Sequence, residues 1–218
     1  MDNFGFYLVI TDPIVGYEKC CEDAVKAGVK VVQLRCKVGI KSGFDFSHVE
    51  VERCRKELLE HAKNFRSITK GTDTIFIVDD DAALAAEVGA DGVHVGQSDM
   101  SVAEVRKLYP NLLIGLSTHS IEQAKLAIPQ EPDYIGTGPV WATPTKQIAD
   151  PTLGVENAAI IHKMVPFPAT AIGGINKANL PQVLKAGIKN YCVVRAVCGA
   201  KSPYDAIREL QDVESSCL

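Results

Sequence analysis

The stretch Val88-Gly89-Ala90-Asp91-Gly92, residues 88–92, contains the joint from which the fold can be worked out. A helical pattern ends at Val88, a glycine follows, and a new apolar run begins at Gly92. The same order recurs at Ala27-Gly28-Val29 and at Ala186-Gly187-Ile188. Glycine just past a helix end adopts the left-handed conformation that turns the chain back towards a sheet. These joints therefore predict a repeated unit in which each helix is followed by a strand.

Short apolar runs of strand type are distributed along the whole chain. They lack the alternation of a half-exposed strand, so each is expected to be buried on both faces in a parallel sheet. The runs are Phe6–Ile10, Val31–Leu34, Thr74–Val78, Gly92–Val95, Leu113–Leu116, Tyr134–Gly136, Ala169–Ile172 and Tyr191–Val194.

Amphipathic stretches of helical period lie between these runs. They are Glu18–Ala27, Val49–Asn64, Val102–Leu108, Ile121–Ile128, Val155–Met164, Leu180–Ala186 and Tyr204–Val213. Eight strands alternating with helices within 218 residues predict an α/β protein with a single (β/α)8 TIM barrel. Residues 1–218 would form one domain, with residues 214–218 as a loose tail. A doubly wound open sheet is the alternative architecture.

Composition restricts the partners. The net charge of −4 is mild, and it argues against nucleic acid, which needs a basic face. No apolar stretch approaches the roughly 20 residues that cross a bilayer, and the N-terminal sequence MDNFGFYLVITD is not that of a signal peptide. The seven cysteines form no C-x-x-C pair, which argues against zinc and favours free thiols in a reducing cytoplasm. We therefore expect a cytoplasmic protein with small-molecule partners and no membrane or nucleic-acid partner.

Active sites of such barrels form at the C-terminal ends of the strands, so the residues that follow each run are the candidates for the site. After the second run, alternation directs Gln33, Arg35 and Lys37 to one side. Two inward cations are suited to gripping a diphosphate. The alternative is an ordinary solvated strand end.

Acidic side chains follow the next two runs. Asp79, Asp80 and Asp81 come after the third, and Asp99 comes after the fourth. Carboxylates at neighbouring strand ends are typical ligands of Mg²⁺ together with substrate phosphates. We expect Mg²⁺ as a cofactor on Asp80 and Asp99, whereas Asp81 has the alternative role of capping the following helix.

Hydroxyl groups and further cations follow the later runs. Ser117 is expected either to donate to a phosphate or to cap the next helix. His119 has no evident partner, and His94 is interpreted as a hydrogen-bonded core residue. The loop after the sixth run is rigid at Pro144 and contains a dense set of anion-binding groups, the hydroxyls of Thr143 and Thr145 and the cation of Lys146. Gly173-Gly174 after the seventh run and Val194-Arg195 after the eighth occupy the usual phosphate site of this fold.

Taken together, these segments resemble thiamine-phosphate synthase, also called thiamine-phosphate pyrophosphorylase. The similarity extends from residue 7 to about residue 200. QLRxK, GQxD, STH and TPTK in this order are the specific motifs, whereas AIGGI also occurs in other phosphate-binding barrels. The matching segments are YLVITD, VVQLRCK, FIVDDD, GADGVHVGQSD, GLSTHS, YIGTGPVWATPTK and AIGGI.

The resemblance implies a transferase that joins hydroxymethylpyrimidine diphosphate to a thiazole phosphate and releases pyrophosphate. It implies that Arg35, Lys37 and Lys146 are catalytic and that Asp80 and Asp99 hold Mg²⁺. The pyrimidine diphosphate would contact Gln33, Arg35, Lys37, Asp79, Ser117 and Lys146. The thiazole phosphate would contact Thr143, Pro144, Thr145, Gly174, Val194 and Arg195.

Four positions depart from the family pattern. Cys36 replaces an acid, Asp79 replaces an Asn, Asp81 stands where a basic residue is common, and Arg195 replaces a Ser. An ionised Asp79 cannot donate to a ring nitrogen of the pyrimidine, whereas Arg195 could bind the thiazole phosphate with two hydrogen bonds. These changes leave the substrate preference open, and they leave the groups expected to bind the diphosphate and the metal intact.

Two other functions remain open. A thiazole tautomerase-like relative would not need the metal acids and the diphosphate cations, and neither would a non-catalytic barrel that binds a phosphorylated ligand. The sequence leaves open whether the chain forms a homo-oligomer and whether the thiazole carries a carboxylate.

Overall fold

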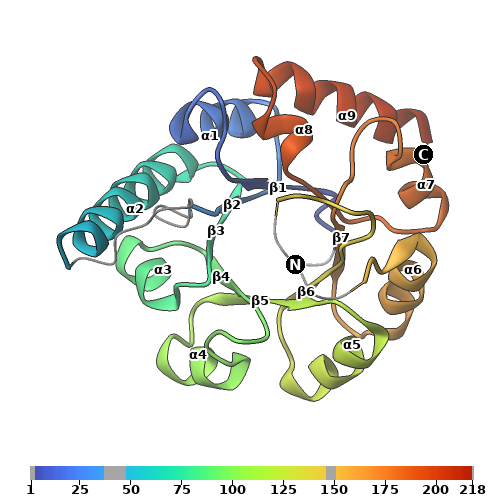
Figure 1. The fold of residues 1–218 in the computed structure, drawn as a ribbon, viewed down its shortest axis with the longest axis horizontal. Helices are drawn as coiled ribbons and strands as arrows, with labels where there is room; N and C mark the ends of the chain where they lie inside the picture. The colour runs from blue at the N-terminus through green and yellow to red at the C-terminus, as the bar shows by residue number, and fades with distance from the viewer. Residues whose placement is uncertain (1–2, 37–47, 146–150, 218) are drawn as a thin grey trace.

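The strands of the computed structural model, which describes residues 3–36, 48–145 and 151–217, close into a parallel barrel (Figure 1). Closure is completed by β8 pairing with β1, with Leu8 opposite Val193. The predicted (β/α)8 barrel is thus confirmed, and the doubly wound alternative is excluded because an open sheet has two edges. The strands are β1 Phe6–Ile10, β2 Val31–Leu34, β3 Ile75–Asp79, β4 Gly92–Val95, β5 Leu113–Thr118, β6 Tyr134–Thr137, β7 Ala169–Ile172 and β8 Tyr191–Val193.

Helices surround the barrel as an outer layer (Figure 1). They are α1 Tyr17–Lys26, α2 His48–Thr69, α3 Ala82–Val88, α4 Val102–Leu108, α5 Ile121–Ala127, the 3₁₀ turn η1 Ile128–Gln130, α6 Gly154–Met164, α7 Leu180–Lys185, α8 Arg195–Cys198 and α9 Pro203–Cys217. The expected loose tail is wrong for residues 214–217, because α9 continues to Cys217. In the described part of the chain, no helix combines the length and hydropathy needed to cross a membrane.

The glycine joints have the predicted conformation. Gly89 ends α3 with φ 67° and ψ 35°, the left-handed region, and its N–H donates to Ala85 and Ala86. Gly28 and Gly187 also have positive φ, at 77° and 85°. A side chain at such a position would be strained, which explains the glycines.

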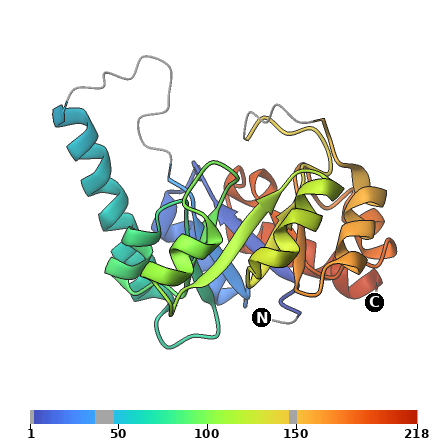
Figure 2. The same ribbon diagram turned by 90° about the horizontal axis from the view of Figure 1, so that it is seen from below.

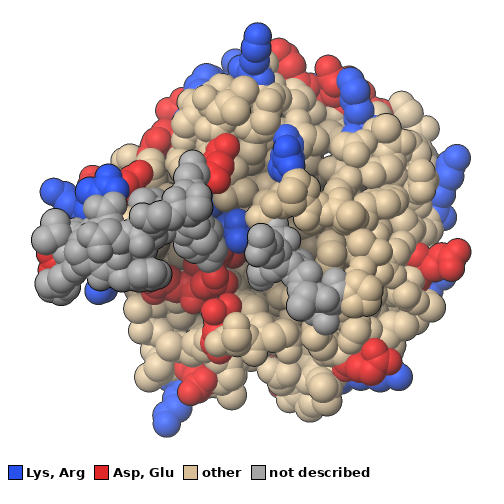
Figure 3. Space-filling model, in the orientation of Figure 1, with Lys and Arg blue, Asp and Glu red and all other residues tan. Residues whose placement is uncertain are grey.

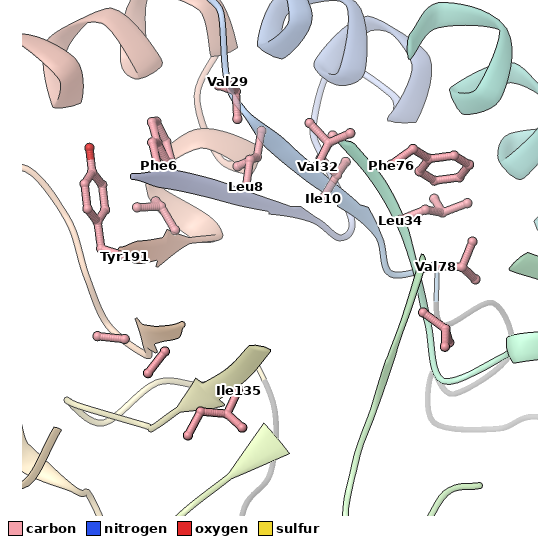
Figure 4. Close-up of a cluster of buried hydrophobic side chains, with 14 of the residues drawn as sticks. Phe6, Leu8, Ile10, Val29, Val32, Leu34, Phe76, Val78, Ile135 and Tyr191 are labelled. Atoms are coloured by element: carbon pink, nitrogen blue, oxygen red, sulfur yellow. The ribbon is translucent and has the colours of Figure 1, made fainter. Parts of the chain in front are cut away.

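Alternation along the strands divides the apolar side chains between two cores. Leu8, Ile10, Val32, Leu34 and Phe76 belong to the larger core, between the strands and the helices (Figure 4). The smaller core fills the inside of the barrel and consists of Phe4, Tyr7, Val9, Val31, Ile77, Tyr134 and Cys192. Burial of each large aliphatic or aromatic side chain contributes roughly 1.5–3 kcal/mol, so both layers stabilise the closed barrel.

The N-terminal segment closes one end of the barrel. The N–H groups of Phe4 and Gly5 donate to Oδ1 of Asn190, each at 3.0 Å. The Phe4 ring is buried and makes edge contacts with Tyr7 and Tyr134, with ring centroids 6.0 Å apart in each pair. Figure 2 shows the N-terminus at this end of the molecule. The opposite end, where the strands finish, is therefore the end available for a site.

Candidate active site

A cavity of about 280 Å³ lies at the C-terminal mouth of the barrel. Its floor includes Tyr7, Val9 and Cys192 from the inner core. Figure 3 shows this face, on which acidic and basic side chains lie beside one another near the centre. The cavity brings together most of the residues selected from the sequence, namely Gln33, Arg35, Asp79, Ser117, Thr143, Pro144, Thr145, Gly174, Val194 and Arg195. Lys37 and Lys146 lie outside the described residues.

Arg35 and Asp79 form an ion pair at the ends of adjacent strands. Nε of Arg35 lies 3.3 Å from Oδ2 of Asp79, and the two side chains are 16% and 11% exposed. An Arg35 terminal nitrogen also lies 3.4 Å from Oγ1 of Thr11. The main-chain N–H of Arg35 donates to Ile10, which continues the pairing of β2 with β1. Arg35 is thus held at the cavity, with Asp79 offsetting part of its charge.

Two buried polar groups at the cavity make no hydrogen bond to the described residues. Nε2 of Gln33 and Oγ1 of Thr170 are both in this state, although their residues are only 3% and 2% exposed. A buried polar group without a partner costs about 1–3 kcal/mol, so both groups are suited to a polar ligand. Thr170 was not selected from the sequence, because inside a strand it resembles any other β-branched core residue.

In the turn after β3, the three consecutive acids Asp79, Asp80 and Asp81 are held by different contacts. The N–H of Asp80 donates to His94 and that of Asp81 to Asp79, each at 2.8 Å. Asp80 has a φ of 62°, a conformation that costs about 1–3 kcal/mol and is concentrated at functional sites. Oδ1 of Asp81 accepts from Leu84 at the start of α3, which confirms the helix-capping interpretation of Asp81.

Asp99 lies in the turn after β4, the strand that pairs with β3. Its Oδ2 accepts from the N–H of Gly96 at 2.8 Å, which fixes the orientation of this exposed carboxylate. Among the described residues, no three His, Cys, Asp or Glu side chains group together as a metal site. Mg²⁺ needs only one or two carboxylates beside water and substrate phosphates. Asp80 and Asp99 each have the hard oxygen donors that this ion prefers, although neither is among the residues that line the cavity.

Ser117 does not cap a helix. The cap of α5 is Ser120, which accepts from the N–H of Gln123 at 3.1 Å. Oγ of Ser117 lies instead 2.9 Å from Nε2 of His94. The capping alternative is therefore wrong, and Ser117 is a side chain of the cavity wall.

His119, which had no evident partner in the sequence, has one in the fold. Its Nδ1 lies 2.7 Å from the carbonyl oxygen of Gly138, and the ring lines the cavity. A carbonyl oxygen only accepts, so Nδ1 carries a proton. The contact fixes the ring against the start of the loop after β6.

The loop after β6 packs closely on the turn after β7. A Cβ at Gly174 would lie 2.8 Å from Cβ of Trp141, and a Cβ at Gly173 would lie 2.6 Å from Cα of Pro139. Both glycines also have positive φ, 69° and 106°. The sequence predicts that these two glycines allow the main chain to approach a phosphate closely. The fold adds a second reason, since larger residues would separate the two segments.

Hydroxyl groups and a cation complete this side of the cavity. Oγ1 of Thr143 accepts from the N–H of Thr145 at 3.3 Å and lies 3.1 Å from the Thr145 hydroxyl. Arg195 is exposed and begins α8, directly after Val194. The position of Arg195 at the cavity agrees with the sequence prediction, whereas the helix α8 itself was not expected, because four residues give no helical periodicity.

A mouth cavity lined by Arg35, Arg195, the carboxylate of Asp79 and several hydroxyls places this chain in the class of (β/α)8 barrels with a polar site at the strand ends. Comparison with known proteins narrows the class. Residues 6–197 match the family model for thiamine monophosphate synthase. The chain therefore belongs to this family, as its motifs indicated.

Individual relatives agree with this assignment. The chain is 36% identical to the thiamine-phosphate synthase of Archaeoglobus fulgidus over 215 residues, which cover 98% of this chain and 95% of that protein. It is 39% identical over 188 residues to the thiamine-phosphate synthase of Prochlorococcus marinus. That match covers 86% of this chain but only half of the longer relative. The solved thiamine phosphate pyrophosphorylase of Pyrococcus furiosus superposes with a TM-score of 0.84 at 31% identity, covering 99% and 97% of the two chains.

Proposed function

We propose that this chain is a thiamine-phosphate synthase, which condenses hydroxymethylpyrimidine diphosphate with a thiazole phosphate or its carboxylate. The products are thiamine phosphate and pyrophosphate, with CO₂ released as a third product where the thiazole carries a carboxylate. The observation that carries the proposal is a single cavity lined by Arg35 and Ser117 from one set of strand ends and by Thr143, Thr145 and Arg195 from another. Two separate groups of anion-binding side chains suit two phosphorylated substrates.

The first group would bind the pyrimidine diphosphate. Gln33 and Ser117 would donate to it, and Asp79 would accept from the exocyclic amine of the pyrimidine. The carbon–oxygen bond breaks with both electrons leaving on pyrophosphate, and the aminopyrimidine supports the methylene cation. Arg35, with Lys37 and Lys146, would stabilise the negative charge where it develops.

Asp80 and Asp99 would hold Mg²⁺. When bound, this ion supplies positive charge that neutralises the diphosphate.

The second group would orient the nucleophile. Thr143, Pro144, Thr145, Gly174, Val194 and Arg195 would hold the thiazole phosphate. The ring nitrogen donates its lone pair to the methylene carbon, and the new carbon–nitrogen bond yields the thiazolium. For the thiazole phosphate without a carboxylate, no proton transfer is needed for this balance, so the protein acts by positioning and by electrostatic stabilisation.

The alternatives are a thiazole tautomerase-like enzyme and a non-catalytic phosphate-ligand barrel. Neither requires a largely buried cation such as Arg35 or the two carboxylates Asp80 and Asp99 after the next two strands. One assay separates the three functions: both substrates are mixed with Mg²⁺, and thiamine phosphate and pyrophosphate are measured. Absence of both products from a folded protein that still binds thiazole phosphate would refute the synthase.

We also propose that the protein works in the reducing cytoplasm. The support is that all seven cysteines are free thiols, four of which are buried. Fractionation of cells that produce the chain tests this location.

A further inference from the structure

A chain of hydrogen bonds crosses the inside of the barrel and ends at Ser117. The hydroxyls of Tyr7 and Tyr134 lie 2.9 Å apart. The Tyr134 hydroxyl lies 3.1 Å from Nδ1 of His94, and Nε2 of His94 lies 2.9 Å from Oγ of Ser117. Tyr7, His94 and Ser117 also line the mouth cavity. The four side chains come from β1, β6, β4 and β5.

Two glycines in the strands of the barrel leave space for these hydrogen-bonded side chains. A Cβ at Gly115 would overlap with Nδ1 of His94 and with the phenol of Tyr134. A Cβ at Gly136 would lie 3.3 Å from Cε1 of His94. Glycine in a strand interior loses packing and conformational entropy. Two such glycines around one histidine therefore indicate a site built to hold that ring.

The direction of the hydrogen bonds follows from burial. Both tyrosines are buried, and desolvation raises the pKa of each phenol, so both keep their protons. Tyr7 is 2% exposed and packs in the inner core with Phe4, Val9 and Cys192. Within the described residues, its hydrogen-bond partner is Tyr134, and a buried donor hydrogen needs an acceptor. Tyr7 thus donates to Tyr134.

The remaining bonds then have fixed directions. Tyr134, whose oxygen accepts from Tyr7, donates its own proton to Nδ1 of His94. A neutral imidazole that accepts at Nδ1 carries its proton on Nε2. His94 therefore donates to Oγ of Ser117, and the Ser117 proton is directed away from His94 towards the cavity.

We propose that His94 is a positioning residue, which orients the Ser117 hydroxyl so that it donates to an oxygen of the substrate diphosphate. This inference rests on the proposed function and adds to it, because the sequence suggested only a core role for His94. Tyr7 and Tyr134 act through His94 by fixing its tautomer. Without the two tyrosine hydroxyls, Nε2 of His94 would accept a hydrogen bond from the Ser117 hydroxyl. The Ser117 proton would then no longer be available to the ligand.

A matched pair of substitutions tests the role of His94. His94→Gln keeps an amide N–H near the position of Nε2, whereas His94→Asn reaches only the position of Nδ1. We expect His94→Asn and Ser117→Ala each to lower kcat/KM for pyrophosphate release by about tenfold to 100-fold, the range for a hydrogen bond to a charged group. His94→Gln should retain most of the activity.

A double-mutant cycle separates positioning from general structure. If His94 acts through Ser117, adding His94→Asn to Ser117→Ala should cause no further loss. Equal losses in both backgrounds, or a His94→Gln variant as impaired as His94→Asn, would overturn the inference. If His94→Asn does not fold, the same cycle with Tyr134→Phe decides, since it removes the donor to Nδ1 and keeps the ring. An inactive wild-type protein would refute the proposed function itself, which is a different outcome.

Discussion

Replacing Asp79 by asparagine should make the protein bind pyrophosphate more tightly while making it less stable. Asp79 lies 3.3 Å from Arg35, the cation proposed to grip the diphosphate. At this distance and an effective dielectric constant of about 20, the attraction between the charges is about 5 kcal/mol before desolvation is counted. A bound diphosphate would compete with the Asp79 carboxylate for the charge of Arg35. The carboxylate would also repel the diphosphate.

The expected gain in pyrophosphate affinity follows from the Coulomb repulsion between the Asp79 carboxylate and the diphosphate. A diphosphate charge about 7 Å from Asp79 would be repelled by about 2 kcal/mol at the same dielectric constant. Magnesium offsets part of this repulsion, so we expect Asp79→Asn to lower the Kd of Mg-pyrophosphate by about tenfold. Asparagine also has an N–H₂ group that can donate to a ring nitrogen, which the carboxylate lacks when ionised.

The loss of stability has the same origin. Arg35 and Asp79 are both largely buried, and asparagine keeps an acceptor but loses the charge. We expect the free energy of unfolding to fall by about 1–2 kcal/mol, or a Tm lower by about 2–8 °C in a chain of this size.

The assays are isothermal titration with Mg-pyrophosphate and thermal unfolding. Asp81→Asn is the matched control, because it removes the same charge two residues away and asparagine caps α3 as well as aspartate. Unchanged or weaker pyrophosphate binding by folded Asp79→Asn would refute the reasoning. An equal gain in Asp81→Asn would refute it too, since the effect would then come from net charge alone.

Three further substitutions test the site and the fold. Asp99→Asn should lower turnover by about 100-fold or more while the unfolding free energy changes by about 0.5 kcal/mol at most, because the side chain is exposed; near-normal pyrophosphate release would exclude its proposed role. Arg195→Ala should raise KM for the thiazole phosphate about tenfold with kcat kept, and initial rates that show the same KM would remove Arg195 from that subsite. Burial lowers the pKa of His162 from 6.5 to about 4. The unfolded chain therefore takes up a proton that the folded chain excludes, and stability falls by about 3 kcal/mol as pH drops from about 6.5 to about 4. His162→Gln should flatten this part of the stability curve in urea titrations, and an equally steep curve would contradict the assignment.

The fold could be predicted from the sequence because its signals are local. Each joint needs only a helix end, a glycine and an apolar run, all within about ten residues. Some strands continue into polar residues beyond the predicted ends: β3 extends to Asp79, β5 to Thr118 and β6 to Thr137, since main-chain pairing does not depend on side-chain polarity. The short α8 was missed because four residues do not show a period.

The candidate site was predictable to a smaller extent. Alternation along one strand directed Gln33 and Arg35 inward, and both line the cavity. The pairing of Arg35 with Asp79 joins different strands, so it depends on register that no local pattern reveals. Ser117 was ambiguous because Ser120 has the same capping chemistry three residues later, and only coordinates show which serine accepts from the helix.

The hydrogen-bond chain inside the barrel has one signal in the sequence, which is the glycine at position 115. Tyr7, His94, Ser117 and Tyr134 are separated by up to 127 positions, and each alone resembles an ordinary strand residue. Gly115 is different, because glycine in the middle of a buried strand sacrifices packing for a reason. Its missing Cβ is the space that His94 and Tyr134 occupy. In a barrel interior, a mid-strand glycine is therefore the better guide to a buried polar group than the polar residue itself, since the group requires an unfilled position on the neighbouring strand.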